Sequence, residues 1–261
     1  MTEPVVRLTV EGPVATVTLN RPASRNAISG ELLARLGEAM ATAEIDDEVR
    51  AVILTGADPA FCAGVDLKEL GQQTSILREA ASGRTRPWAP VSKPVIAAVN
   101  GAAVTGGLEL VLNCDIVICS DRAVFADTHA RVGVLPGWGL SVLLPLAVGR
   151  SRARQMSFTG DFLPADQALT AGLVSEVVPH EDLLGRAREI ATAIAGNDAR
   201  AVQALLASYR QTEAEVVGGG YAVEESTARA WGQSGLDLAE TGRRRAAVTE
   251  RGRSQAARGE P

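Results

Sequence analysis

Apolar and other residues alternate at the start of the chain and then change to a helical period. Residues 5–10 and 14–19 alternate and are separated by Glu11-Gly12-Pro13, a pattern that predicts a β-hairpin. Ser29 is a typical helix N-cap, and apolar residues follow it at helical spacing to about Ala43. The chain is therefore predicted to open with two strands and one helix.

The middle of the chain consists of short apolar runs that predict buried strands. These runs lie at 51–54, 94–100, 116–119 and 123–126, and a short helix is expected at 108–113. Residues 72–90 show poor periodicity and contain Gly83 and Pro87, which predicts a mobile segment over a pocket.

After Leu140 the pattern becomes helical, with one short strand expected at 173–178. Helices are predicted at 140–148, 151–158, 165–171, 181–195, 199–211, 221–231 and 236–247. Strands that alternate with helices and are followed by helices alone predict an α/β core and a helical end. We expect the core in residues 1–196 and a C-terminal helical subdomain in 197–261.

Composition narrows the class of protein. With 261 residues, of which 46% are hydrophobic, the chain can bury a sizeable core. Its longest apolar runs fall short of the ~20 residues of a membrane helix, and its first residues lack a secretory pattern, so a cytoplasmic protein is expected. The net charge of −5 argues against a nucleic-acid surface. Three cysteines and two histidines are too few and too scattered to predict a metal site.

Two apolar segments end in glycine just before a helical pattern. One contains Ala63-Gly64-Val65 and the other contains Gly106-Gly107. Such turns leave backbone N–H groups unpaired and directed at a ligand. If the two turns face each other, they form an oxyanion hole. Glu109 would lie within about one helical turn (~5 Å) of these donors, which predicts a base beside an anion site.

These segments, in this order, resemble those of the enoyl-CoA hydratase/isomerase (crotonase) superfamily. The resemblance extends to residues 14–22, 25–28, 52–56, Asp115 and 135–137. It implies a spiral of repeated strand and helix units, with C-terminal helices that assemble trimers or pairs of trimers. It also implies an acyl-CoA thioester as substrate, with no separate cofactor, and catalysis through a stabilised enolate.

Matching residues take their expected roles from this resemblance. The N–H groups of Val65 and Gly106 would form the oxyanion hole, and Glu109 would serve in acid–base catalysis. Arg25 would lie near the pantetheine and phosphates, and the backbone of Ala63 near the adenine. The full set expected around the substrate is Arg25, Ala27, Ala63, Gly64, Asp66, Leu67, Gly107, Val132 and Gly137.

The chain departs from the family pattern at His129. Hydratases of this group hold one water between two glutamates, and counting back from Gly133–Gly137 puts His129 at the second of these positions. An imidazole, with an ordinary pKa of about 6.5, can still donate a proton or hold the water. The alternative is a residue that only lines the pocket. Asp127 either compensates for the missing carboxylate or bonds the local turn.

Several functions therefore stay open at this point. Hydration of a 2-enoyl-CoA is the leading prediction. The alternatives are isomerisation, decarboxylation or thioester hydrolysis at the same oxyanion hole, and acyl-CoA binding without catalysis. Trp138 is expected either to wall off the acyl pocket or to pack in the core. A dinucleotide-binding fold is disfavoured because no Gly-x-Gly-x-x-Gly follows a predicted strand.

Overall fold

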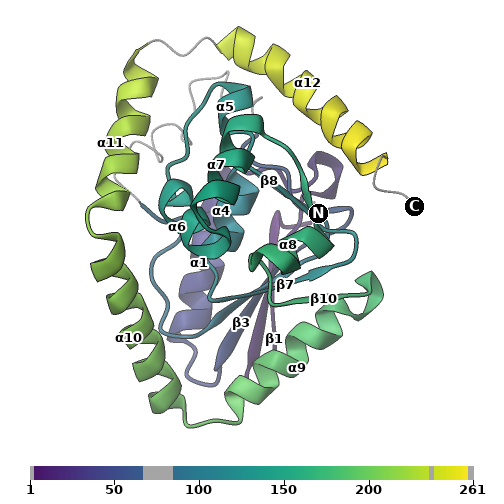
Figure 1. The fold of residues 1–261 in the computed structure, drawn as a ribbon. Helices are drawn as coiled ribbons and strands as arrows, with labels where there is room; N and C mark the ends of the chain where they lie inside the picture. The colour runs from purple at the N-terminus through teal and green to yellow at the C-terminus, as the bar shows by residue number, and fades with distance from the viewer. Residues whose placement is uncertain (1–2, 67–84, 235–237, 258–261) are drawn as a thin grey trace.

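A computed structural model describes residues 3–66, 85–234 and 238–257. Leu67 and most of the predicted mobile segment at 72–90 lie outside these ranges. The fold contains a larger sheet in the order β1-β2-β3-β5-β7-β10 and a smaller sheet in the order β4-β6-β8-β9. Helices cover the larger sheet and surround the smaller one (Figure 1).

The larger sheet contains the strands that carry the clearest apolar patterns. Its members are β1 (Val6–Glu11), β2 (Val14–Leu19), β3 (Ala51–Gly56), β5 (Val95–Val99), β7 (Ile116–Ser120) and β10 (Glu176–Val178). The predicted hairpin is confirmed, because β1 and β2 pair antiparallel. The remaining neighbours pair in parallel, as expected of strands joined by helical crossovers.

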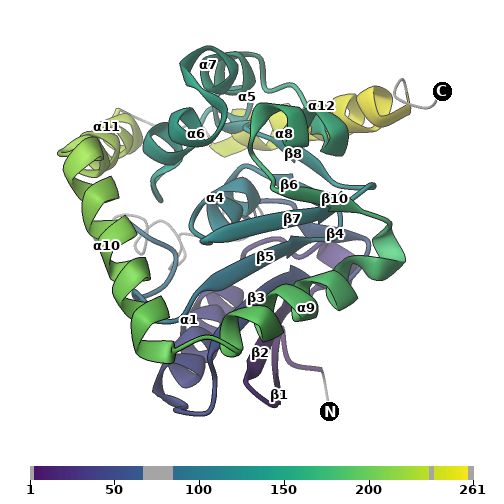
Figure 2. The same ribbon diagram turned by 60° about the horizontal axis from the view of Figure 1, so that its bottom comes forward.

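Each face of this sheet is covered by a different set of elements. Helix α9 (Leu183–Ala195) packs Leu183, Ala187 and Ala191 against side chains of β2, β3, β5 and β7. Figure 2 shows α9 running along the outer side of the sheet. Helix α1 (Gly30–Ile45) contributes its apolar face to the main core on the other side, and its predicted cap is confirmed because Ser29 Oγ accepts from the Leu32 amide at 3.0 Å.

The smaller sheet brings separate parts of the chain to one edge. Strands β4 (Ala60–Cys62), β6 (Ala102–Val104) and β8 (Val124–Ala126) are parallel, and β9 (Leu163–Pro164) runs antiparallel to β8. Only the strand at β8 was predicted. The segments that follow β4, β6 and β8 begin at residues 63, 105 and 127. Because carboxyl ends of parallel strands meet at one edge, these segments converge.

The remaining helices lie around the two sheets. They are α4 (Gly106–Leu112), α5 (His129–Val132), α6 (Leu140–Val148), α7 (Arg150–Thr159), α8 (Ala165–Ala171), α10 (Ala199–Val217), α11 (Gly220–Gln233) and α12 (Leu238–Ala257). Short 3-10 turns occupy Pro22–Ser24 and His180–Asp182. Among residues 3–66, 85–234 and 238–257, no helix is both long and apolar enough to cross a membrane.

The C-terminal helices run around the periphery of the molecule (Figure 1). Helix α11 packs against α6, and α12 packs against α5. Helix α12 extends ten residues beyond the predicted 236–247, whereas the predicted strand 173–178 shortens to β10. The expected α/β architecture with a helical end is confirmed. The division into two units at residue 196 stays a prediction, although a turn does separate α9 from α10 there.

Candidate active site

The two glycine-ended turns predicted from the sequence lie side by side. A Cβ atom placed on Gly106 would lie 3.5 Å from Val65 Cγ2, and one placed on Gly64 would lie 3.6 Å from the Gly106 nitrogen. Neither the Val65 nor the Gly106 amide donates a hydrogen bond among the residues that the structure describes. Two free donors in adjacent turns can bind one negatively charged oxygen.

A short parallel bridge explains why the Val65 amide has no acceptor among the described residues. The Ile28 amide donates to the Gly64 carbonyl at 2.8 Å, and the Asp66 amide donates to the Ile28 carbonyl at 2.8 Å. The Ala63 amide donates to Arg25 at 3.0 Å. Because successive amides along an extended segment point to opposite sides, the Val65 N–H points away from this bridge.

Arg21 fixes the loop that carries the expected coenzyme contacts. Its guanidinium lies 3.0 Å from Asp66 Oδ2 and also donates to the Ala27 carbonyl. The Asp66 side chain and Ala27 are buried, so Arg21 gives both a structural partner. Arg25 differs, because it is exposed and its guanidinium has no hydrogen bond or ion pair among the described residues. Arg25 is thus available to a phosphate group.

Gly107 is required by packing. A Cβ atom there would lie 2.2 Å from the Cys62 carbonyl oxygen, so only glycine lets α4 approach β4 this closely. The resemblance places Gly107 among the substrate residues, and this stays a prediction. The contact between helix and strand is a separate reason for glycine at this position.

We expect Gly107→Ala to lower the free energy of unfolding by about 1–3 kcal/mol or more, because backbone atoms must move to accept the methyl group. Chemical denaturation measures the change. The matched control is Gly185→Ala in α9, where a Cβ atom would meet nothing within 4 Å. There alanine should stabilise the protein by about 0.5–1 kcal/mol. Equal effects at the two positions would contradict the packing argument.

Glu109 is a buried carboxylate whose two oxygens have different partners. It lies in the first turn of α4, and its side chain is 4% exposed. Oε1 accepts from the amides of Gly137 at 3.1 Å and Trp138 at 2.7 Å. Oε2 lies 3.4 Å from His129 Nε2. The loop amides therefore hold the carboxylate in place and leave the second oxygen facing the imidazole.

His129 lies between two carboxylates. Its Nδ1 is 2.7 Å from Asp127 Oδ1, which also accepts the His129 amide at 3.1 Å. Burial opposes the charged imidazole, but the bonds to Asp127 and Glu109 outweigh it and raise the pKa of His129 to about 10. Burial likewise opposes the charge on Asp127, and its bonds to His129 lower the pKa of that carboxyl. At neutral pH His129 is an imidazolium whose Nε2–H faces Glu109.

This arrangement answers the question that the sequence left open for Asp127. The carboxylate bonds both the local turn and the imidazole ring. An acidic residue two positions before a histidine, at the end of a predicted strand, is the only signal that the sequence offers for such a pair.

Two further expected residues adjoin the site through the backbone. Val132 is buried one helical turn after His129 on α5, and Gly137 donates to Glu109. The Trp138 side chain is 5% exposed and belongs to the main hydrophobic core. Its amide binds Glu109, and its carbonyl accepts from Asn113 Nδ2 at 2.9 Å. Of the two interpretations of Trp138, the structure supports packing in the core.

Glu224 was missed in the sequence analysis. It comes from α11, is 6% exposed, and accepts from the amides of Gly139 and Ser141, both at 2.6 Å. It thereby caps α6 and fixes the loop just after Gly137 and Trp138. Burial raises the pKa of Glu224, and the bonds to Ser141 oppose this rise. Its partners lie more than 80 residues away in sequence, so no local pattern could reveal the contact.

We expect Glu224→Gln to lower the free energy of unfolding by about 1–3 kcal/mol, since an amide cannot accept from both backbone donors without turning its NH₂ group toward one of them. Thermal and denaturant unfolding measure this. The control is Glu225→Gln, which removes a surface pair with Arg229 and should cost less than about 0.5 kcal/mol. A Glu224→Gln protein as stable as this control would refute the capping role.

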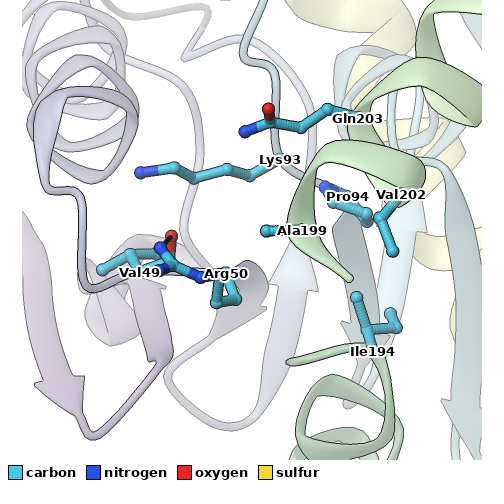
Figure 3. A pocket seen from close by; sticks show the side chains of 8 residues that line it. All are labelled: Val49, Arg50, Lys93, Pro94, Ile194, Ala199, Val202 and Gln203. Atoms are coloured by element: carbon cyan, nitrogen blue, oxygen red, sulfur yellow. Dashed lines mark hydrogen bonds between the residues drawn. The ribbon is translucent and has the colours of Figure 1, made fainter. Parts of the chain in front are cut away.

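A small cavity has a lining that includes none of the active-site residues named above, and Figure 3 shows the side chains around it. Its volume is about 10 Å³, room for roughly one water, and its lining comprises Val49, Arg50, Lys93, Pro94, Ile194, Ala199, Val202 and Gln203. The buried Lys93 ammonium donates to the carbonyls of Ala43, Glu44 and Asp46 at 2.5–3.0 Å and so caps the end of α1. Burial lowers the pKa of Lys93, but its donors are committed to the backbone. This cavity is structural.

Comparison with known proteins identifies a family of enzymes that act on thioesters of coenzyme A, in agreement with the geometry of the site. The model of the enoyl-CoA hydratase/isomerase family matches residues 9–229. A probable mitochondrial enoyl-CoA hydratase of Dictyostelium discoideum is 40% identical over 208 residues, which is 77% of this chain and 75% of that protein. A short-chain-enoyl-CoA hydratase of Clostridium acetobutylicum is also 40% identical over 208 residues, covering 76% of this chain and 78% of the other.

Comparison with solved structures identifies the same family as the sequence comparison. The crystal structure of an enoyl-CoA hydratase from Mycobacterium smegmatis superposes with a TM-score of 0.82 at 53% identity, over 89% of this chain and all of the other. The chain belongs to the enoyl-CoA hydratase/isomerase family and is an enzyme of that family. Within the described ranges, no group of three histidine, cysteine, aspartate or glutamate residues is placed to hold a metal ion.

Proposed function

We propose that this enzyme adds water across the double bond of a 2-enoyl-CoA thioester. The observation that carries the proposal is the contact of 3.4 Å between Glu109 and the charged His129, at the edge where the free Val65 and Gly106 amides also lie. Relatives at 40% identity that are named enoyl-CoA hydratases support the same reaction.

The thioester oxygen would bind the two free amides. As the nucleophile attacks the β-carbon, the electron pair of the double bond moves toward this oxygen and forms an enolate. Preoriented amides stabilise the new charge without reorganising, and each contributes about 3 kcal/mol to lowering the barrier. Gly64 and Gly106 support this role, because their lack of Cβ atoms keeps the two turns close.

Glu109 and His129 would share the water. A water molecule about 2.8 Å from both Oε2 and Nε2 forms a triangle with their 3.4 Å separation, so it can lie beside the pair. Glu109 takes one proton from this water, and the remaining hydroxide adds to the β-carbon. The His129 imidazolium then gives its Nε2 proton to the α-carbon. Transfer of the proton from Glu109 to His129 restores both groups.

Coenzyme A would serve as the handle of the substrate. Arg25 is the cation proposed for its phosphates, because the guanidinium is exposed and unpaired among the described residues. The backbone around Ala63 and the segments of Val132 and Gly137 would line the rest of the path, and Leu67 falls outside the described ranges. Arg21 would hold Ala27 and Asp66 in place beneath this path.

The trimer and the cytoplasmic location stay predictions. Apolar side chains that are 48–73% exposed along α10 and α11 support association with further copies of the chain. They are Leu205, Tyr209, Val216, Val223 and Trp231.

A direct assay tests the proposed reaction. The conjugated thioester of a 2-enoyl-CoA absorbs in the ultraviolet, and hydration removes this absorbance. We expect the purified enzyme to cause this loss and to form a 3-hydroxyacyl-CoA. No loss across straight and branched substrates of several lengths would reject hydration. Product analysis with a panel of acyl-CoA esters then distinguishes isomerisation, decarboxylation, thioester hydrolysis and binding alone.

A further inference from the structure

We propose that Thr128 is a positioning residue for the turn at Thr105 and Gly106, which we call the oxyanion turn. It acts through a buried hydrogen bond to Thr105. This inference rests on the proposed role of the Gly106 amide. The bond joins Thr105 Oγ1 and Thr128 Oγ1 at 2.5 Å, and both residues are buried.

Thr105 has a backbone conformation that a β-branched residue rarely adopts. Its φ is +57° and its ψ is −115°, whereas threonine strongly prefers negative φ. Such a conformation persists only where surrounding contacts determine it. Three contacts do so here. The Thr105 amide donates to the Ala126 carbonyl at 2.8 Å, its carbonyl accepts from the Glu109 amide at 3.1 Å, and its hydroxyl is held by Thr128.

The strained residue sets the direction of the Gly106 amide. The peptide group between residues 105 and 106 carries the Gly106 N–H, and the ψ angle of Thr105 rotates this group. If Thr105 relaxed to negative φ, the N–H would swing away from its present direction beside Val65. The carbonyl of this peptide group accepts from the Glu109 amide, so the hydroxyl bond acts together with that contact in maintaining the orientation that an oxyanion donor requires.

The hydrogen bond between Thr105 and Thr128 also connects the oxyanion turn to the segment that contains His129. Thr128 directly precedes His129 and is the N-cap residue of α5. Strands β6 and β8 pair Val104 with Ala126, so the segments that leave them run side by side. One hydrogen bond between side chains thus links the oxyanion turn to the segment that carries the proposed proton donor.

A suppressor experiment tests this role. We expect the isosteric Thr128→Val to lower kcat about tenfold or more, with KM changed less than threefold, because Thr105 then loses the side-chain contact among those that hold its strained conformation. Glycine adopts positive φ freely. The double variant Thr105→Gly/Thr128→Val should therefore regain kcat to within about threefold of the wild type. Thr128→Ser, which keeps the hydroxyl, should also stay within threefold.

Two outcomes would overturn the inference. One is a folded Thr128→Val enzyme with kcat within twofold of the wild type. The other is a double variant that stays as impaired as Thr128→Val, which would mean that Thr128 acts on His129 or on stability alone. If Thr128→Val does not fold, Thr128→Ala and the double variant with Thr105→Gly provide the same comparison, with thermal unfolding recorded for each.

A second measurement separates this inference from the proposed reaction. Acetoacetyl-CoA is a β-keto thioester whose enolate absorbs in the near ultraviolet, so the enolate fraction of bound ligand reports on the oxyanion site without any addition of water. We expect this fraction to fall about tenfold in Thr128→Val and to recover in the double variant. An enzyme that shows this pattern but hydrates no 2-enoyl-CoA would refute the hydratase proposal alone. Unchanged enolate binding in Thr128→Val would refute the positioning role alone.

Discussion

Glu109→Gln should lower kcat for hydration by about 10³-fold or more while the Kd for an acyl-CoA thioester changes less than about threefold. The amide oxygen can still accept from Gly137 and Trp138, so the loop geometry is kept. The amide NH₂ then faces the His129 Nε2–H, and neither group can take a proton from water. Loss of a general base typically costs 10²- to 10⁴-fold. Steady-state kinetics and calorimetric binding measure the two quantities.

The matched control is Glu189→Gln on α9, an exposed residue that forms an ion pair with Arg186. It should leave both kcat and Kd unchanged. A Glu109→Gln enzyme that keeps more than a tenth of wild-type kcat would exclude Glu109 as the base. If the wild type and Glu109→Gln bind the thioester equally and neither turns it over, the protein binds acyl-CoA without this catalysis.

Sequence patterns predicted those parts of the fold whose signals are local. The hairpin alternates regularly over two six-residue strands, and Ser29 with its following apolar residues defines both the start and the buried face of α1. Gly64 and Gly106 could be recognised only jointly and with Glu109 nearby, because a single glycine before a helical pattern is an ordinary turn residue. These features depend on neighbours within one or two turns of chain.

The assembly of the site could not be predicted in the same way. Strands β4 and β6 have three residues each, too few to show a period, yet their carboxyl ends carry the Val65 and Gly106 turns to one edge. Glu224 reaches Gly139 from a distant helix, and this contact depends on how α11 packs against α6. Such contacts are decided by tertiary packing, which leaves no trace in a short window of sequence.

For His129, the sequence predicted the position of the residue but not its charge. Its place in the chain followed from spacing, but its charge depends on two carboxylates. One is its neighbour Asp127, and the other comes from α4. An isolated imidazole of pKa about 6.5 would be mostly neutral at pH 7.5, whereas this one has a pKa of about 10. Of the two active roles that the sequence left open, donating a proton or holding the water, this charge supports proton donation.

His129→Gln should lower kcat about 10²-fold or more, because glutamine can hold a water but cannot give a proton to the α-carbon.

The pH dependence of kcat/KM should follow the charge on the His129 imidazole. In the wild type, kcat/KM should stay high until the pH approaches 10 and then fall as the imidazolium loses its proton. Asp127→Asn removes one of the two carboxylates that raise this pKa, so the fall should move toward neutral pH. Initial rates between pH 6 and pH 10.5 measure both effects.

The free energy of unfolding provides an independent test of the charge on His129. A histidine whose pKa is raised in the folded protein stabilises it fully below the unfolded pKa of about 6.5, and this contribution disappears as the pH rises through about 10. The difference in unfolding free energy between wild type and His129→Gln should therefore shrink steadily over this interval. His180→Gln is the control, because that histidine pairs with the exposed Asp58 near the surface. A difference that stays constant from pH 6.5 to 10, together with an unshifted rate profile in Asp127→Asn, would mean that His129 is neutral and that the proton for the α-carbon comes from another group.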